Sequence, residues 1–382
     1  MDPVLLRNFQ GKSVVKKVAI VLNSAWQAYN FRLNLARGMK ENGYEVVFIA
    51  PDDANYSKKI QEEFDFYNIS IDAKGINPVE DLKVLFSLYK LYKNIKPDIV
   101  LNFTIKPNIY SAIVAKLLGI KSINNITGLG TVFIKKSIIT TIAKLLYKIS
   151  LSSASKVFFQ NTDDKNLFIK EKLVQEEKTD LIPGSGVDTK KFSPVEYINN
   201  DIFKFLMVAR VLRDKGVYEY IQAIKILKQK YDNLEFQLLG EVGVENKTAV
   251  SKEELYSWID EGIINYLGST DNVKSFLSKV DCVLLPSYRE GTPRSLLEAA
   301  SMAKPIVTTN VVGCKEVVED GLNGFLCEVK NAKDLALKMQ KIIELPKDER
   351  KSMGQRGREK IINEFDEKIV IDKYLQTISE LL

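Results

Sequence analysis

The sequence predicts an α/β protein made of two doubly wound, Rossmann-like domains that face a cleft. Short apolar segments alternate with helical patterns along most of the 382 residues, which favours parallel sheets covered by helices on both faces. The chain is longer than one compact core usually requires, and the alternation starts again after residues 193–201. We therefore expect a first domain over 1–192 and a second over 193–365, with a helix at about 366–382 packing back on the first.

The first predicted domain opens with a β-α-β unit. A strand over 18–24 is followed by a helix over 28–41 and a strand over 45–51. The turn at 23–27 contains no glycine, so the dinucleotide-binding fingerprint of many oxidoreductases is absent there. The next predicted elements are a strand over 69–73, a helix over 79–95, a strand over 97–103, a helix over 108–118, strands over 122–126 and 155–161, and a helix to about residue 172.

One apolar segment of this domain permits two interpretations. The stretch VFIKKSIITTIAKLLYKISLS follows Thr131 and carries lysines at helical spacing. Charges interrupt it too often for a membrane span. A basic amphipathic helix of this kind can lie in a membrane interface with its lysines on anionic headgroups. An ordinary helix that faces the core would produce the same pattern.

The second domain repeats the alternation after the loop DLIPGSGVD at 180–188 and a linker at 193–201. In two such domains the cleft between them and the carboxyl ends of the strands are the expected ligand sites. The predicted elements are strands over 203–209, 234–240, 264–268, 281–286, 305–309 and 324–329, helices over 217–231 and 272–280, a helix opened by the capping-box pattern at 251–254, and terminal helices from 332 and from 366.

Composition limits the chemistry. The chain has no histidine, so proton transfer would fall to carboxylates, lysine or the substrate itself. Its three cysteines, Cys282, Cys314 and Cys327, are too widely spaced for a zinc site or a disulfide framework, which favours a reducing compartment. Residues 1–17 have no apolar core of the length that a secretory signal needs.

Charge is distributed unevenly along the chain. Residues 1–192 contain 28 Lys and Arg and 19 Asp and Glu, a net charge of +9, whereas the remainder contains 27 and 30, a net charge of −3. No acidic residue lies between Asp98 and Asp163, although this stretch is rich in lysine. The stretch predicts a surface that faces an anionic partner, unless lysine is simply the favoured surface cation of this composition.

The stretch YREGTPRSLLEA at 288–299 follows an apolar strand and opens an amphipathic helix. Thr292 is expected to cap this helix, with Pro293 in its first turn. Glu290 then lies in the loop and Glu298 in the second helical turn. A helix N-terminus favours a phosphate, and the two carboxylates can accept hydroxyl groups, which suits a nucleotide-sugar. A solvated helix face could carry the same pair of acids.

Longer motifs resemble glycosyltransferase family 4, which has GT-B architecture. They are SYREGTPRSLLEA, VARVLRDKG, YLGST and KPIVTTNVVGCKEVVEDGLNGFL, and they cover nearly the whole second domain. The first-domain motifs FTIKPNIY, NNITGLGTVF and LIPGSGVD are similar to the CapM- and PglA-like branch. Members of that branch add a sugar to a polyprenyl-diphosphate-linked acceptor at the cytoplasmic face of the membrane.

The resemblance implies roles for particular residues. Arg210 and Lys215 match the basic pair that neutralises the donor diphosphate and stabilises the leaving group. Glu290 matches the acid that contacts the transferred sugar, and Glu298 the acid that accepts hydrogen bonds from the ribose. Further donor-binding positions are expected at Gly291, Thr292, Gly240, Glu241 and Thr270.

The same resemblance implies a retaining reaction without a metal ion or cofactor. The favoured route is front-face displacement, in which the departing β-phosphate oxygen helps to deprotonate the acceptor hydroxyl. Two motifs depart from the family pattern. The loop TIKPN at 104–108 stands where many relatives carry a histidine, and NSA at 23–25 replaces a glycine-rich turn. These differences affect the acceptor side rather than the diphosphate site.

Acceptor contacts are expected at Asn23, Lys106, Thr127 and Gly128, which follow predicted strands of the first domain. The predicted function is transfer of a hexose or N-acetylhexosamine from a UDP-sugar to a polyprenyl-diphosphate-linked saccharide, peripheral on the inner face of the cell membrane. The expected partners are these substrates and an anionic membrane surface, with no nucleic acid. A nucleotide-sugar isomerase and a non-catalytic sugar-binding protein remain as alternatives.

Overall fold

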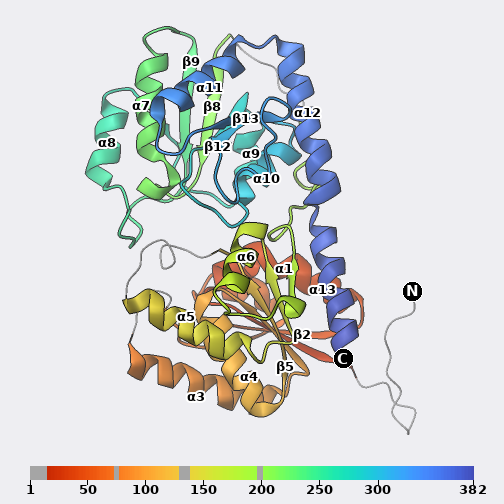
Figure 1. The fold of residues 1–382 in the computed structure, drawn as a ribbon. Helices are drawn as coiled ribbons and strands as arrows, with labels where there is room; N and C mark the ends of the chain where they lie inside the picture. The colour runs from red at the N-terminus through yellow and green to blue at the C-terminus, as the bar shows by residue number, and fades with distance from the viewer. Residues whose placement is uncertain (1–14, 73–76, 129–137, 196–200) are drawn as a thin grey trace. The chain divides into compact units, whose positions relative to one another are not determined.

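The computed structural model describes residues 15–72, 77–128, 138–195 and 201–382. The chain forms two compact units, Met1–Ser185 with Lys368–Leu382, and Gly186–Glu367. Each unit contains one parallel sheet with helices packed on its faces (Figure 1). The predicted α/β class, with two Rossmann-like domains, is confirmed.

The sheet of the first unit has seven strands in the order β3-β2-β1-β4-β5-β6-β7. The strand order reverses between β1 and β4, and doubly wound sheets bind ligands at the carboxyl ends of the strands at such a point. The strands are β1 (Lys17–Val21), β2 (Glu45–Ala50), β3 (Asp65–Asn68), β4 (Ile99–Phe103), β5 (Lys121–Ile126), β6 (Lys156–Phe159) and β7 (Thr179–Leu181).

Helices cover both faces of this sheet. One face packs against α1, α2 and α13, and the other against α3, α4, α5 and α6. The helices are α1 (Ala25–Glu41), α2 (Tyr56–Gln61), α3 (Pro78–Ile95), the π-helix η1 (Pro107–Ser111), α4 (Ala112–Leu118), α5 (Ile138–Leu151), α6 (Thr162–Lys170), the 3-10 helix η3 (Glu176–Lys178) and α13 (Glu367–Leu381).

Several predicted elements of this unit are displaced. The prediction of a strand over 69–73 is wrong. The strand in this region is β3, which ends at Asn68, and Ile69 and Ile71 are buried in the connection that follows it. Burial without strand pairing explains the misleading apolar pattern. The helix α1 starts three residues earlier than predicted because the side chain of Ser24 caps it, accepting from the Gln27 N–H. The short elements α2 and β7 were not predicted.

The last helix, α13, belongs to the first unit although it is encoded at the end of the chain. Its buried face consists of Val370, Tyr374 and Ile378, which join the core on one side of the sheet. The Tyr374 ring packs edge-on against Phe158, with centroids 5.0 Å apart. The Asn125 amide donates to the Tyr374 hydroxyl at 2.9 Å, so this helix is held by both packing and a buried polar contact.

The sheet of the second unit has six strands in the order β10-β9-β8-β11-β12-β13. Its strands are β8 (Phe203–Val208), β9 (Leu234–Leu239), β10 (Asn265–Tyr266), β11 (Cys282–Leu285), β12 (Ile306–Thr309) and β13 (Gly324–Cys327). Its helices are η4 (Arg213–Lys215, a 3-10 helix), α7 (Val217–Leu227), α8 (Lys252–Asp260), α9 (Val273–Leu277), α10 (Arg294–Ser301), α11 (Ala332–Glu344) and α12 (Lys347–Glu364).

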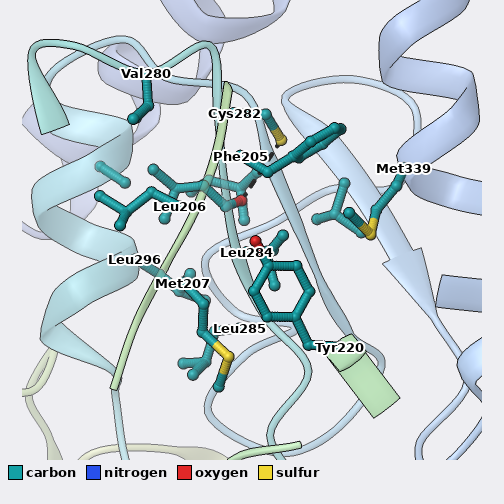
Figure 2. Close-up of a cluster of buried hydrophobic side chains, with 14 of the residues drawn as sticks. Phe205, Leu206, Met207, Tyr220, Val280, Cys282, Leu284, Leu285, Leu296 and Met339 are labelled. Carbon is teal, nitrogen blue, oxygen red and sulfur yellow. Dashed lines mark hydrogen bonds between the residues drawn. The ribbon is translucent and has the colours of Figure 1, made fainter. Parts of the chain in front are cut away.

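The central strands β8 and β11 are buried on both faces, which explains their continuous apolar sequences. Figure 2 shows Phe205, Leu284 and Tyr220 in the core that these strands form with α7, α10 and α11. The helix predicted over 217–231 ends at Leu227, and the two predicted terminal helices are three. Pro346 separates α11 from α12, because proline cannot continue a helix.

Candidate active site

The predicted donor-binding residues gather at one edge of the second sheet. Because its strands are parallel, the loops after β8, β9, β10 and β11 all leave from their carboxyl ends, where such sheets bind ligands. Arg210 and Lys215 follow β8, Gly240 and Glu241 follow β9, Thr270 follows β10, Glu290, Gly291 and Thr292 follow β11, and Glu298 lies in α10.

Lys215 and Glu290 meet at this edge in an ion pair. The ammonium group of Lys215 donates to Glu290 Oε1, and the two side chains are 20 % and 13 % exposed. Arg210 lies on the same loop as Lys215, is exposed, and forms no ion pair within the described part of the chain. The structure therefore brings Lys215 and Glu290 together and leaves a second cation facing solvent nearby in sequence.

The loop that carries Glu290 is held by backbone contacts to two other loops. Asp214 O accepts from the Tyr288 N–H at 2.9 Å and from the Ser287 hydroxyl at 3.0 Å. The Glu290 N–H donates to Val312 O at 3.0 Å. These contacts connect the loop after β11 to the loops after β8 and β12, so the position of the Glu290 carboxylate is determined by three segments distant in sequence.

Two glycines make this close packing possible. Gly313 has φ +90°, and a Cβ there would lie 2.5 Å from Glu290 O. Gly216 has φ +80°, and its Cβ would lie 2.1 Å from Pro286 O. Any other residue would be strained by φ and would also displace the backbone beside the ion pair. Sequence analysis did not single out either glycine, although a glycine in a loop after an apolar strand was the available signal.

The loops after β9 and β10 form the next part of the edge. The carbonyl of Gly240 accepts from the Tyr266 hydroxyl at 2.8 Å, and the carbonyl of Glu241 accepts from the Val211 N–H at 2.9 Å. The side chain of Thr270 is exposed, and its Oγ1 accepts from the Asn272 N–H at 3.0 Å. The backbone in this part of the edge is therefore connected to the loop that carries Arg210.

Glu298 is nearly buried in α10 and is paired with Arg294. The Arg294 Nε–H donates to Glu298 Oε1 at 2.9 Å. Burial raises the pKa of Glu298, while the charges of Arg294 and Lys191 oppose that rise. The helix begins at Arg294 and Pro293 occupies the N-cap position. The prediction that Thr292 is the N-cap with Pro293 in the first turn is therefore wrong by one residue, because the extended φ and ψ angles of Pro293 keep it out of the helix.

The predicted acceptor residues lie at the corresponding edge of the first sheet. Asn23 follows β1, Lys106 follows β4, and Thr127 and Gly128 follow β5. The three strands are adjacent and parallel, so the structure brings the four residues to one edge. Both sides of the strand-order reversal are represented, because Asn23 comes from β1 and Lys106 from β4.

This edge contains polar atoms that other side chains do not satisfy. Asn23 Oδ1, Thr104 Oγ1 and Asn108 Oδ1 are buried without a hydrogen-bond partner among the described residues. Thr104 has φ +69°, which is a genuine outlier for a β-branched residue. A π-helix, η1, follows directly. Unsatisfied acceptors, backbone strain and a π-helix are each frequent at binding sites.

Lys106 is not a free cation. Its ammonium group forms an ion pair with Asp81 of α3 at 2.8 Å, and both side chains are less than 15 % exposed. Burial raises the pKa of Tyr110, and a hydrogen bond to Asp81 raises it further. The cationic charge expected of Lys106 is therefore neutralised by a carboxylate that precedes it by 25 residues.

Other lysines of the acid-free stretch are also paired. Lys144 contacts Glu171 at 3.0 Å, and Lys156 contacts Asp180 at 3.9 Å. Residues 129–137, which include part of the predicted amphipathic segment, lie outside the described residues. Lysine density along the sequence thus overstates the positive charge of the folded surface.

Two features are absent from the described ranges. These ranges contain no group of three or more His, Cys, Asp or Glu side chains arranged to hold a metal ion. None of their helices combines the length and apolar character needed to cross a membrane.

Comparison with known proteins identifies the family. Residues 188–360 match the family model of the glycosyl transferases group 1, and residues 17–161 match that of the glycosyl transferase 4-like domain. The chain is 28 % identical to the N,N'-diacetylbacillosaminyl-diphospho-undecaprenol alpha-1,3-N-acetylgalactosaminyltransferase of Campylobacter jejuni, over 96 % of this chain and 99 % of the relative.

Two further comparisons agree with this result. The chain is 24 % identical to the UDP-Gal:alpha-D-GlcNAc-diphosphoundecaprenol alpha-1,3-galactosyltransferase of Escherichia coli, over 86 % of this chain and 87 % of the relative. The solved structure of Anabaena Alr3699/HepE with UDP and glucose has the same fold, with a TM-score of 0.79, 17 % identity, and coverage of 96 % of this chain and 100 % of that one. The two family models together cover most of both units, and the chain is a glycosyltransferase of GT-B fold that combines a glycosyl transferase 4-like domain with a glycosyl transferases group 1 domain.

Proposed function

We propose that this glycosyltransferase moves a hexose or N-acetylhexosamine from a UDP-sugar to a polyprenyl-diphosphate-linked saccharide. The observation that carries the proposal is the Lys215–Glu290 pair at the carboxyl edge of the second sheet, on loops that Gly216 and Gly313 allow to pack closely. The names of the Campylobacter and Escherichia relatives, which describe undecaprenyl-diphosphate-linked acceptors, support the acceptor class. The Escherichia relative is named for a UDP-sugar, which supports the donor class.

On the donor side, we infer that Arg210 and Lys215 bind the diphosphate and stabilise the charge that develops on it. A hydroxyl of the transferred sugar would donate to Glu290, and the ribose hydroxyls to Glu298. The remaining donor contacts are proposed at backbone and side-chain groups that lie on the same edge, namely Gly240, Glu241, Thr270, Gly291 and Thr292.

The proposed reaction retains the anomeric configuration and uses no metal ion. The acceptor oxygen forms a bond to the anomeric carbon on the face from which UDP departs, and the bond from that carbon to the β-phosphate oxygen breaks. The acceptor proton passes to the departing phosphate oxygen. No histidine exists in the chain to act as a base, so the leaving group serves that purpose while Lys215 and Arg210 oppose its negative charge.

On the acceptor side, we propose contacts from Asn23, Lys106, Thr127 and Gly128. The unsatisfied oxygen of Asn23 suits a saccharide hydroxyl donor. Because a polyprenyl chain is embedded in lipid, the proposal also places the protein peripherally on the inner face of the cell membrane. The proposed transfer reaction needs no metal ion, so chelation with EDTA should leave the rate of sugar transfer unchanged.

The test is UDP release from a panel of UDP-sugars, with and without a polyprenyl-diphosphate-linked sugar. We expect Lys215→Ala and Glu290→Ala to lower acceptor-dependent kcat/KM by on the order of 10²-fold or more, because each removes a charged group aimed at the reacting substrate. The matched controls are Lys225→Ala and Glu261→Ala, which break an exposed ion pair of the same unit and should leave the rate unchanged.

Two results would contradict the proposal. Normal transfer by both the Lys215 and the Glu290 variant would exclude the donor-site assignment. An inverted anomeric configuration in the product, determined by nuclear magnetic resonance, would exclude the front-face reaction. A UDP-sugar isomer formed without acceptor would instead indicate isomerase activity.

A further inference from the structure

The helix α3 has apolar side chains on two opposite faces. One face, which includes Val84, Leu88, Tyr92 and Ile95, is buried against the first sheet. Residues on the opposite face recur at intervals of three and four and therefore form one stripe. These are Val79, Leu82, Phe86 and Tyr89, which are 60 %, 65 %, 59 % and 37 % exposed.

A second exposed apolar stripe lies on α5. Ile142, Leu145 and Ile149 follow the same spacing and are between 46 % and 58 % exposed. Both helices pack on the same face of the first sheet (Figure 1), and both contact η1. Their outer sides therefore point away from the same side of the unit. We call these two outer stripes together the α3–α5 face.

The charges around this face are mostly positive. Lys90 and Lys93 lie over the rings of Phe86 and Tyr89, with the ammonium nitrogens 4.4 Å and 5.5 Å from the ring centroids. Lys148 on α5 is also exposed. The helix α5 contains no acidic residue.

The two acids of α3 do not offset these lysines. Glu80 is paired with Lys83 at 2.7 Å, and Asp81 is turned inward, where it is paired with Lys106 at 2.8 Å. A surface helix of a globular protein usually presents polar residues, together with charged residues of both signs, on its outer side. This helix instead presents apolar groups with lysines beside them.

We propose that the α3–α5 face docks on an anionic membrane surface, with its apolar side chains in the interfacial layer and its lysines on the headgroups. Charge complementarity decides the occupant, because lysine is depleted at protein–protein interfaces whereas it is favoured beside anionic lipid. The inference rests on the proposed function, since a polyprenyl-linked acceptor lies in a membrane, and it adds α3 to the segment that sequence analysis considered.

The experiment is co-sedimentation of the full chain with vesicles of phosphatidylglycerol and phosphatidylcholine in equal parts, and with vesicles of phosphatidylcholine alone. The first variant, Leu82→Ser/Phe86→Ser, removes apolar area. The second, Lys90→Glu/Lys93→Glu, reverses two charges. The matched control, Tyr256→Ser/Leu337→Ser, changes two side chains of similar exposure in the second unit.

We expect the Lys90→Glu/Lys93→Glu variant to bind the anionic vesicles at least about 25-fold more weakly, since each lysine near the surface contributes a factor of about five in affinity and this variant removes two. The Leu82→Ser/Phe86→Ser variant should bind more weakly by on the order of tenfold or more, because it removes two apolar side chains from the interfacial layer. The control should bind like the unchanged protein, and added salt should weaken its binding. Unchanged vesicle binding by both α3 variants would overturn the proposal. A dimer of the unchanged chain that the α3 variants dissociate, measured by light scattering, would assign the face to a second copy and also overturn it.

A second readout separates this inference from the proposed function. UDP binding, measured by calorimetry, should be the same in the α3 variants and the unchanged protein, because their substitutions lie in the other unit from the donor residues. Transfer to a vesicle-embedded acceptor should fall, whereas transfer to a short-chain, water-soluble acceptor should not. If vesicle binding falls as expected but no acceptor is glycosylated by any form, the docking surface stands and the proposed function fails.

Discussion

Two buried or half-buried lysine–carboxylate pairs distinguish the carboxyl edges of the two sheets. Lys215 meets Glu290 in the second unit, and Lys106 meets Asp81 in the first. Each pair joins residues that are distant in sequence. The sequence pattern could therefore identify the lysines but not the carboxylate with which each forms an ion pair. Removing one partner of such a pair leaves an uncompensated charge, so a substitution at either site lowers the free energy of unfolding for electrostatic reasons alone.

Glu298 provides a prediction at the scale of one residue. Burial raises the pKa of Glu298, and the proposed ribose hydroxyls require the ionised carboxylate as acceptor. Affinity for UDP should therefore be highest above this raised pKa and should fall as the pH drops through it. At about pH 8, Glu298→Gln should bind UDP about tenfold more weakly, because a hydrogen bond to a charged group contributes roughly 1.5 kcal/mol or more.

Calorimetric titrations from about pH 8 down to 4.5, the ordinary pKa of a glutamate, check this prediction. The UDP phosphate also titrates in that range, but it does so with both proteins, and the ratio of their affinities isolates Glu298. The advantage of the unchanged protein should shrink toward low pH. A ratio that is constant with pH would contradict the assigned role of Glu298.

At the scale of elements, alternation of apolar strands and helical patterns predicts most of the secondary structure. Errors occur where local sequence is outweighed by tertiary packing. Ile69 and Ile71 are apolar because a connection is buried, not because a strand forms. The close approach of loops in the second unit was not predicted, because it depends on positive φ angles. Glycine permits such angles, but its presence in a sequence does not show that it adopts them.

Gly313 provides a prediction about these loops. Gly313→Ala should lower kcat/KM by on the order of 10²-fold, because the new Cβ would push away the backbone of Glu290 and Gly291 and so misplace the carboxylate that we propose to contact the transferred sugar. The matched control is Gly321→Ala. Gly321 has φ +80° but nothing within 4 Å of its Cβ position, so it should show only the strain of about 1–2 kcal/mol that a positive φ imposes.

Steady-state kinetics and urea unfolding of the two variants separate the contributions. Both should lose some free energy of unfolding, and only the Gly313 variant should also lose activity. Equal activity of the two variants would show that the contact between Gly313 and the Glu290 loop has no catalytic consequence.

At the scale of the whole molecule, the chain leaves the first unit and returns to it. The chain segment that leaves the first unit near residue 186 is hydrogen-bonded to the segment that returns near residue 367. The Val187 N–H donates to Phe365 O and the Glu367 N–H donates to Val187 O, both at 3.0 Å. The last helix then completes the core of a unit whose other elements all lie in the first half of the chain.

Tyr374 tests this arrangement. Its ring is fully buried in the first unit, so Tyr374→Ala should destabilise that unit by about 3–5 kcal/mol, as is typical when a large buried side chain is removed. Hydrogen–deuterium exchange should show faster exchange in β4, β5 and β6 and unchanged protection in β8 and β11. The control is Ile361→Ala, on the buried face of α12. It should speed exchange in β8 and β11 and leave the protection of β4, β5 and β6 unchanged. Uniform loss of protection in both units would contradict the assignment of α13 to the first unit.

The sequence by itself determined the α/β class, the two-domain organisation and the family resemblance, because strand and helix periodicity and contiguous motifs such as SYREGTPRSLLEA are local properties of the chain. Tertiary structure alone decided which side chains and segments lie together. Asp81 neutralises Lys106, Gly313 lies against Glu290, and an outer apolar stripe on α3 lies on the same side of the sheet as that of α5. These contacts join segments far apart in sequence, and only the packing of helices on a twisted parallel sheet determines their proximity.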